Sequence, residues 1–241
     1  MTSKKTIALF GAGSGLGASL AARFGAEGYR VALVARRAAP LEARVAELAS
    51  AGIEAAAFPA DLTNLEGIPA LVRAIEARFG AIDVAVYAPV PTDISFVPAV
   101  DLDAKTLQAM TNIFTLSPIE TSHAVLPAML ARGDGAVVIV GGLTAVVTMP
   151  GKSGVGPAMA AARNYVYTLN AETASKGVYA GTVNIGALID RSAGMRAMTA
   201  SGAPLDPKMP VIDPDTIAEE IWALVTKRDR VESILPPLPQ Q

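Results

Sequence analysis

Four glycines within seven residues form the part of this sequence best suited to bind a ligand. They follow the apolar stretch Thr6–Phe10 and overlap the start of a helical pattern that runs to Glu27. Glycine permits a tight turn and a close approach of backbone to ligand, and a helix N-terminus offers unpaired N–H groups to an anion. A strand, a glycine turn and a helix in this order predict a pocket for the pyrophosphate of a dinucleotide, although an ordinary turn would use the same glycines. The expected contact residues are Gly11, Gly13, Ser14, Gly15, Leu16 and Gly17.

Two arginines stand where the second predicted strand ends. A carboxylate at this place binds the ribose 2′-hydroxyl of NAD, but this chain has Ala35 followed by Arg36 and Arg37. A guanidinium pairs well with a phosphate, so the sequence favours NADP(H) as cofactor, with a solvated pair of surface arginines as the alternative. Asp61, directly after the third predicted strand, also has two interpretations: it accepts a hydrogen bond from the adenine amine, or it caps a helix.

The elements that must position these residues alternate between short β-branched runs and helical periodicity. That pattern is typical of a parallel sheet with crossover helices, and a hydrophobic content of 51% can cover both faces of such a sheet. We therefore predict an α/β fold with a doubly wound parallel sheet (a Rossmann fold), in a single domain over residues 1–241. The expected strands are Thr6–Phe10, Arg30–Val34, Glu54–Pro59, Asp83–Tyr87, Ala136–Val140, Val178–Asn184 and Glu232–Leu235. The expected helices are Gly15–Glu27, Pro40–Ala51, Glu66–Phe79, Lys105–Arg132, Val155–Lys176 and Pro214–Lys227.

Composition argues against several classes of partner. The chain has 20 Lys and Arg against 22 Asp and Glu, with no basic run, so we expect no nucleic-acid partner. It has no cysteine and one histidine, so we expect no metal and a reducing, cytoplasmic location. The longest uncharged run, Gly135–Gly151, contains glycines and a proline and is too short for a membrane span, so we expect no membrane association.

The glycine turn and several later segments resemble the short-chain dehydrogenase/reductase family. The family's cofactor turn is Thr-Gly-x-x-x-Gly-x-Gly, which here reads Phe10-Gly11-x-x-x-Gly15-x-Gly17. Asp61-Leu62-Thr63 is similar to the family's adenine-site Asp-Val-Thr, and Tyr87-Ala88-Pro89-Val90 stands where the family has Asn-Asn-Ala-Gly. Ile185-Gly186 falls at the family's Pro-Gly. The resemblance implies further cofactor contacts at Leu62, Ala88, Ile185 and Gly186.

The resemblance also implies a catalytic Ser, Tyr and Lys, and this chain departs from the family there. In the register of the matching segments, Gly142 replaces the Ser, Val155 the Tyr and Met159 the Lys. None of these side chains can transfer a proton. No tyrosine of the chain is followed by a lysine four residues later, so the departure does not depend on the alignment. The family's usual proton relay is therefore not encoded here.

Two nearby residues are weak candidates for replacing the lost chemistry. Thr144 lies two residues after Gly142 and points to the same side if the strand continues, but a threonine in a loop is the simpler interpretation. Lys152 precedes the helix that carries Val155 and Met159 and could polarise a carbonyl, or it could lie in solvent while Ser153 caps the helix.

The sequence leaves three functions open. The leading hypothesis is an NADPH-dependent oxidoreductase for a small-molecule substrate with an apolar carbonyl, imine or activated alkene. The second is a catalytically inactive NADP(H)-binding sensor or partner subunit, and the third is a non-redox enzyme that uses the same pocket. The resemblance further implies a homodimer or homotetramer, and it places a substrate-covering segment around Met195–Met209.

Overall fold

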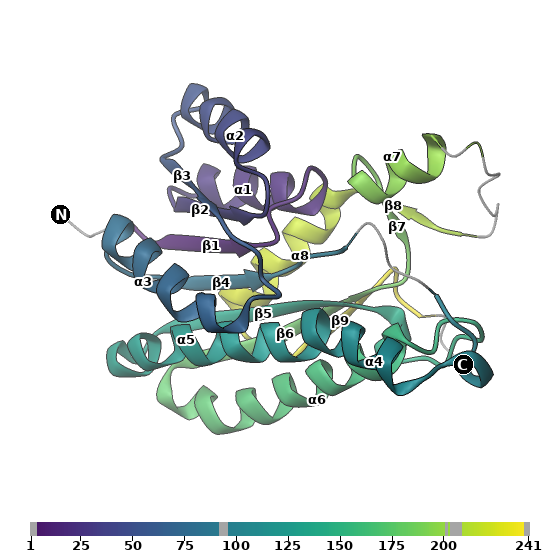
Figure 1. The fold of residues 1–241 in the computed structure, drawn as a ribbon. Helices are drawn as coiled ribbons and strands as arrows, with labels where there is room; N and C mark the ends of the chain where they lie inside the picture. The colour runs from purple at the N-terminus through teal and green to yellow at the C-terminus, as the bar shows by residue number, and fades with distance from the viewer. Residues whose placement is uncertain (1–3, 92–95, 201, 203–208, 239–241) are drawn as a thin grey trace.

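Seven parallel strands form the central sheet of the protein, in the order β3-β2-β1-β4-β5-β6-β9 (Figure 1). The structure is a computed structural model that describes residues 4–91, 96–200, 202 and 209–238. The sheet strands are β1 (Thr6–Phe10), β2 (Arg30–Ala35), β3 (Ala55–Pro59), β4 (Val84–Tyr87), β5 (Gly135–Gly142), β6 (Val178–Ile185) and β9 (Glu232–Leu235). All seven predicted strands are present, so the doubly wound α/β fold is confirmed.

Helices cover both faces of this sheet (Figure 1). On one face lie α1 (Leu16–Ala26), α2 (Ala38–Ser50) and α8 (Pro214–Lys227), which share one hydrophobic core with the sheet. On the other lie α3 (Ile68–Phe79), α5 (Ser117–Arg132) and α6 (Val155–Thr173), which share a second core. Strand β1 contributes side chains to both cores. Ile7 and Leu9 lie in the core with α1, and the alternate residues Ala8 and Phe10 lie in the core with α3.

The predicted helix Lys105–Arg132 is wrong in one respect, since it is not continuous. It consists of α4 (Ala104–Thr111), one π-helical turn (Asn112–Leu116) and α5. Pro118 has no N–H to donate to a carbonyl one turn earlier, and the Tyr87 hydroxyl donates to the Ile113 carbonyl at 2.7 Å. Both features favour the wider turn, which a periodicity argument does not detect.

Three short elements between β6 and α8 are absent from the sequence prediction. Strands β7 (Leu188–Ile189) and β8 (Val211–Ile212) pair with each other, and α7 (Ala193–Ala200) lies between them. Two-residue strands carry no periodic signal, so only their pairing across more than twenty residues defines them. As Figure 1 shows, these elements stand beyond the sheet edge at which β1 ends.

Candidate functional site

The strand ends that carry most of the predicted site residues meet at one edge of the sheet. Strand β1 lies between β2 and β4, with Phe10 paired to Val34 on one side and to Tyr87 on the other. Because all the strands are parallel, their carboxyl ends face the same way. The chain order reverses between β1 and β4, which is the place where open α/β sheets bind ligands.

The glycine turn after β1 has a backbone shape that requires glycine. Gly11 has φ +99°, and an ideal Cβ on it would lie 2.4 Å from the Pro89 nitrogen. A Cβ on Gly17 would lie 2.8 Å from the Ala12 backbone, whereas the nearest atom to a Cβ on Gly13 is 4.0 Å away. Gly11 and Gly17 therefore permit close backbone packing, and Gly13 leaves space above the turn.

Unpaired amides at this turn form a candidate anion site. The Gly11 and Ala12 N–H groups both donate to the Val34 carbonyl, at 3.0 and 2.8 Å, and that of Gly13 donates to Gly11. Within the described part of the chain, the next amides, those of residues 14–17, have no hydrogen-bond acceptor, and no side chain caps α1. A helix start of this kind fits a phosphate group, and the residues present therefore fit the pyrophosphate of a dinucleotide.

Arg36, Arg37 and Asp61 lie at the ends of the two strands beyond β1. Both arginines are exposed, and Arg36 lies close enough to Asp61 to help lower the pKa of its carboxyl group. The larger causes of that lowered pKa are hydrogen bonds from Thr63, whose N–H and hydroxyl donate to Asp61 Oδ1 at 3.0 and 2.8 Å. Asp61 thus stabilises a local turn and does not cap a helix, because the next helical turn begins after Asn64 and α3 after Gly67, both without a side-chain cap. A hydrogen bond from adenine to Asp61 stays a prediction.

The remaining predicted cofactor residues fall into two groups. Ala88 donates its N–H to Phe10 at 2.8 Å and so adjoins the glycine turn, while Leu62 is buried with its carbonyl bonded to the Ser117 hydroxyl at 2.7 Å. Ile185 and Gly186 lie farther along the edge, where Gly186 donates to Leu235 at 2.7 Å. The edge therefore carries Ala88 beside the glycine turn, Leu62 after β3 next to α5, and Ile185 and Gly186 at the end of β6.

The residues at the end of β5 form a second, apolar cluster. The Gly142 N–H points at the Met159 sulfur at 3.1 Å, and the Thr144 hydroxyl lies 3.9 Å from the same sulfur. Val155 stands one helical turn before Met159 on α6 and is buried. The structure thus brings Gly142, Thr144 and Met159 together. Thr144 lies in a short 3-10 turn after the strand, which agrees with the simpler interpretation of a threonine outside the strand.

Lys152 contacts a different neighbour. Its Nζ lies over the Phe96 ring at 5.2 Å, a cation–π arrangement. Helix α6 begins after Gly154 without a side-chain cap, so Ser153 does not have the capping role considered for it. Among the described residues the Lys152 side chain forms no hydrogen bond with Thr144 or Met159, so the structure gives Lys152 no support as a partner of this cluster.

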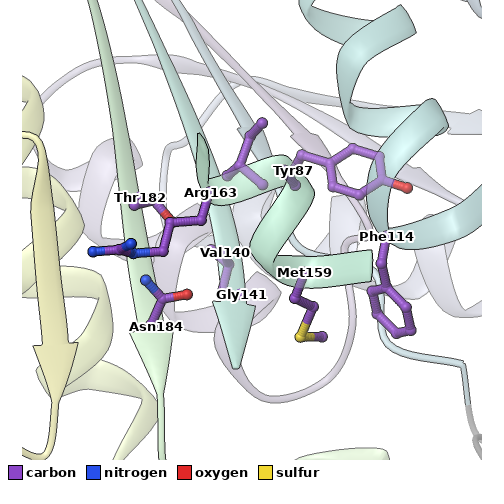
Figure 2. Close-up of a pocket in the computed structure, with 10 residues that line it drawn as sticks. Tyr87, Phe114, Val140, Gly141, Met159, Arg163, Thr182 and Asn184 are labelled. Carbon is purple, nitrogen blue, oxygen red and sulfur yellow. The ribbon is translucent and has the colours of Figure 1, made fainter. Parts of the chain in front are cut away.

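A narrow cavity lies beneath the apolar cluster, and Figure 2 shows its lining. Tyr87, Phe114 and Met159 line one side, and Arg163 and Asn184 line the other. The cavity measures about 10 Å³, which is space for about one water molecule and not for a substrate. Burial raises the pKa of the Tyr87 hydroxyl far above its usual range, and its proton is given to a backbone carbonyl, so Tyr87 has no acid role here.

Arg196 of α7 contacts the glycine turn, a contact that the sequence did not predict. Its guanidinium donates to the Ser14 hydroxyl at 2.5 Å and to the Arg191 carbonyl at 2.8 Å. The two side chains that meet are 182 residues apart in the sequence, so no local motif signals the contact.

Two further observations limit the chemistry of the described residues. They contain no cluster of three or more His, Asp or Glu side chains that could hold a metal ion. None of their helices combines the length and apolar character needed to cross a membrane.

Comparison with known proteins assigns the family. The model of the short chain dehydrogenase family matches residues 5–197, which is more than half of the chain. The chain belongs to the short-chain dehydrogenase/reductase family. This confirms the resemblance seen in the glycine turn and in the later segments.

Several relatives and solved structures are similar to this chain over more than nine tenths of its length. A dehydrogenase/reductase SDR family protein 7-like of Drosophila melanogaster is 28% identical, over 93% of this chain and 71% of its own. An uncharacterized oxidoreductase of Staphylococcus aureus is 25% identical, over 94% and 93% of the two chains. The structure of ElxO with NADP bound has a TM-score of 0.83 at 20% identity and covers 96% of each chain. A metagenomic short-chain oxidoreductase in complex with NADP has a TM-score of 0.79 at 23% identity and covers 98% of each.

Proposed function

We propose that this protein is an NADP(H)-binding oxidoreductase that reduces an apolar carbonyl, imine or activated alkene without the family's Ser-Tyr-Lys relay. The observation that carries the proposal is the row of unpaired amides after Gly13, together with the exposed Arg36 at the end of the neighbouring strand β2. Two structural neighbours were crystallised with NADP, which supports the same cofactor for this chain.

Each part of the proposed cofactor site has a physical role. The amides of residues 14–17 bind the pyrophosphate, and the Arg36 guanidinium binds the 2′-phosphate with Arg37 beside it. Asp61 and the Leu62 backbone contact the adenine, while Ala88, Ile185 and Gly186 line the path toward the nicotinamide. NADPH, when bound, would supply the hydride.

Proton supply is the unusual feature of the proposal. Gly142, Val155 and Met159 stand where the family has its Ser, Tyr and Lys, and the Met159 thioether cannot donate a proton. Thr144 carries the hydroxyl closest to this cluster, with its Oγ1 3.6 Å from an ideal Cβ on Gly142. The Thr144 hydroxyl orients the substrate's polar atom, and water supplies the proton. The sulfur and the buried Val155 favour an apolar substrate.

The apolar cluster also favours a second candidate function. The Met159 sulfur accepts the Gly142 N–H and carries no proton of its own, so it cannot act as a general acid. An inactive NADP(H)-binding sensor or partner subunit would need only the proposed cofactor site and no proton donor. For both candidate functions we expect a cytoplasmic protein that forms a homodimer or homotetramer. Light scattering of the purified protein would measure its molar mass and thus the number of subunits.

Calorimetry followed by a turnover assay tests both proposals. We expect NADPH to bind more tightly than NADH, because only NADPH carries the 2′-phosphate. Steady NADPH oxidation with a panel of apolar ketones, aldehydes, imines and enones would support the oxidoreductase. Tight binding without turnover would support the sensor, whereas no affinity for either nucleotide would refute both.

The substitution Arg36→Ala is expected to weaken NADPH binding about 10- to 100-fold, since hydrogen bonds to charged groups contribute about 1.5–3 kcal/mol each. NADH serves as the internal control, because it has no phosphate for Arg36 to bind. Calorimetric dissociation constants for both nucleotides measure the effect. An equal loss for the two nucleotides would show that Arg36 does not contact the 2′-phosphate.

A further inference from the structure

We infer that Arg196 is a pyrophosphate ligand, supplied by the segment Asp190–Ala200, which lies against the glycine turn. This inference rests on the proposed function, because it assigns a new residue to the same cofactor site. Neither the glycine motif nor the two arginines after β2 points to it.

The contact between Arg196 and Ser14 places a guanidinium at the candidate anion site. Arg196 donates to the Ser14 hydroxyl at 2.5 Å, and Ser14 begins the run of amides that lack an acceptor in the described chain. A phosphate on those amides would lie next to the Ser14 side chain and within the reach of the same guanidinium. A planar guanidinium binds phosphate oxygens better than it binds a neutral hydroxyl.

The segment that carries Arg196 fits closely over the turn. An ideal Cβ on Gly15 would lie 3.0 Å from the Ser192 Cβ and 3.2 Å from the Asp190 carbonyl oxygen. The Ser192 hydroxyl accepts a hydrogen bond from the Met195 N–H at 3.0 Å and so stabilises the first turn of α7. The segment therefore packs directly against the turn at Gly15, and a bound pyrophosphate would lie beside this contact, at Ser14.

Arg191 and Arg196 differ in the kind of group that their guanidinium groups contact. Arg191 forms ion pairs with Asp213 and Asp215 at the start of α8, which anchor the base of the segment. Arg196 bonds only to a hydroxyl and a carbonyl, and it has no carboxylate partner within the described residues. Its positive charge is thus available for an anion, and binding a phosphate would exchange the bond to neutral Ser14 for a charged one.

Arg196 and Arg36 are proposed to bind different phosphate groups, so their loss should affect NADPH and NADH differently. The pyrophosphate is common to NADPH and NADH, so loss of Arg196 should weaken both nucleotides equally. Loss of Arg36 should weaken NADPH alone. The dissociation constants of each variant for NADPH and NADH therefore show which phosphate group each arginine binds.

The test compares Arg196→Met, Arg196→Lys and Arg73→Met with the unmodified chain by calorimetric titration of NADPH and NADH. Arg73 is exposed on α3, which lies on the opposite face of the sheet from α1, so Arg73→Met removes an equal charge from another part of the surface. We expect Arg196→Met to weaken both nucleotides about tenfold or more, Arg196→Lys to weaken both less, and Arg73→Met to change neither. Arg196 is exposed, so thermal unfolding should be unchanged.

Two results would overturn the inference. Unchanged dissociation constants for Arg196→Met, in a chain whose unmodified form binds NADPH, would remove Arg196 from the site and leave the proposed function standing. An unmodified chain that binds neither nucleotide would refute the proposed function and this inference together.

Discussion

Substituting Gly142→Ser, Val155→Tyr and Met159→Lys together is expected to raise carbonyl-dependent NADPH oxidation at least about 100-fold over the unmodified chain. A positioned general acid contributes about 10²–10⁴-fold. Val155 and Met159 share one face of α6, and the Met159 sulfur lies 3.2 Å from an ideal Cβ on Gly142. The new hydroxyl and phenol would reach one substrate oxygen, with the ammonium lowering the pKa of the phenol. NADPH absorbance with a panel of ketones and aldehydes measures the rate.

A matched variant isolates the contribution of the phenol. Gly142→Ser, Val155→Phe and Met159→Lys has the same bulk without the hydroxyl and should stay near the unmodified rate. Val155 is buried, so a ring there costs about 1–3 kcal/mol in both variants, and thermal unfolding checks that both remain folded. Equal rates for the Tyr and Phe variants would contradict the placement of the reacting atoms above this cluster.

The substitution Gly11→Ala is expected to reduce the free energy of unfolding by about 3–5 kcal/mol. The positive φ of +99° contributes about 1–3 kcal/mol of strain, and overpacking contributes about as much again. The overlap cannot relax easily, because the atoms nearest to the new Cβ belong to the Ala88–Pro89 backbone, at 2.4–2.7 Å. Urea unfolding followed by circular dichroism measures the loss.

Gly52→Ala separates the two contributions. Gly52 also has a positive φ, +76°, but no described atom lies within 4 Å of an ideal Cβ on it. We expect it to lose only about 1–2 kcal/mol, from backbone strain alone. If the two variants lost equal stability, the close approach of the glycine turn to the end of β4 would not be a stabilising constraint.

The parts of the fold that were predictable are those whose signals are local. Strand β1 and the glycine turn after it occupy adjacent residues, so their order in the sequence is their order in space. The alternation of strands and helices then predicts a parallel sheet, and a parallel sheet brings the ends of β2 and β3 to the same edge as the turn. The sequence alone therefore suffices to place Arg36 and Asp61 together.

The parts that were missed depend on contacts between distant segments. The π turn after α4 is favoured by the hydrogen bond from the Tyr87 hydroxyl to the Ile113 carbonyl, and helical periodicity in the sequence does not reveal that bond. The contact of Arg196 with Ser14 joins residues that are 182 positions apart in the sequence. Asp61 shows a third limit: the same residue type at the same position serves as a turn cap or as a ligand contact, and spacing does not separate the two.

The reversal of strand order between β1 and β4 separates two tasks within one edge of the sheet. In the proposed site, most nucleotide contacts come from residues before position 90, with Ile185, Gly186 and Arg196 added by later segments, and bond-making chemistry would depend on the end of β5 and on α6. Residues of the two sets that share no contact affect free energy additively, so those of the second set can change without weakening nucleotide binding. Such a scaffold can lose its reaction in evolution and still report how much reduced coenzyme the cell contains.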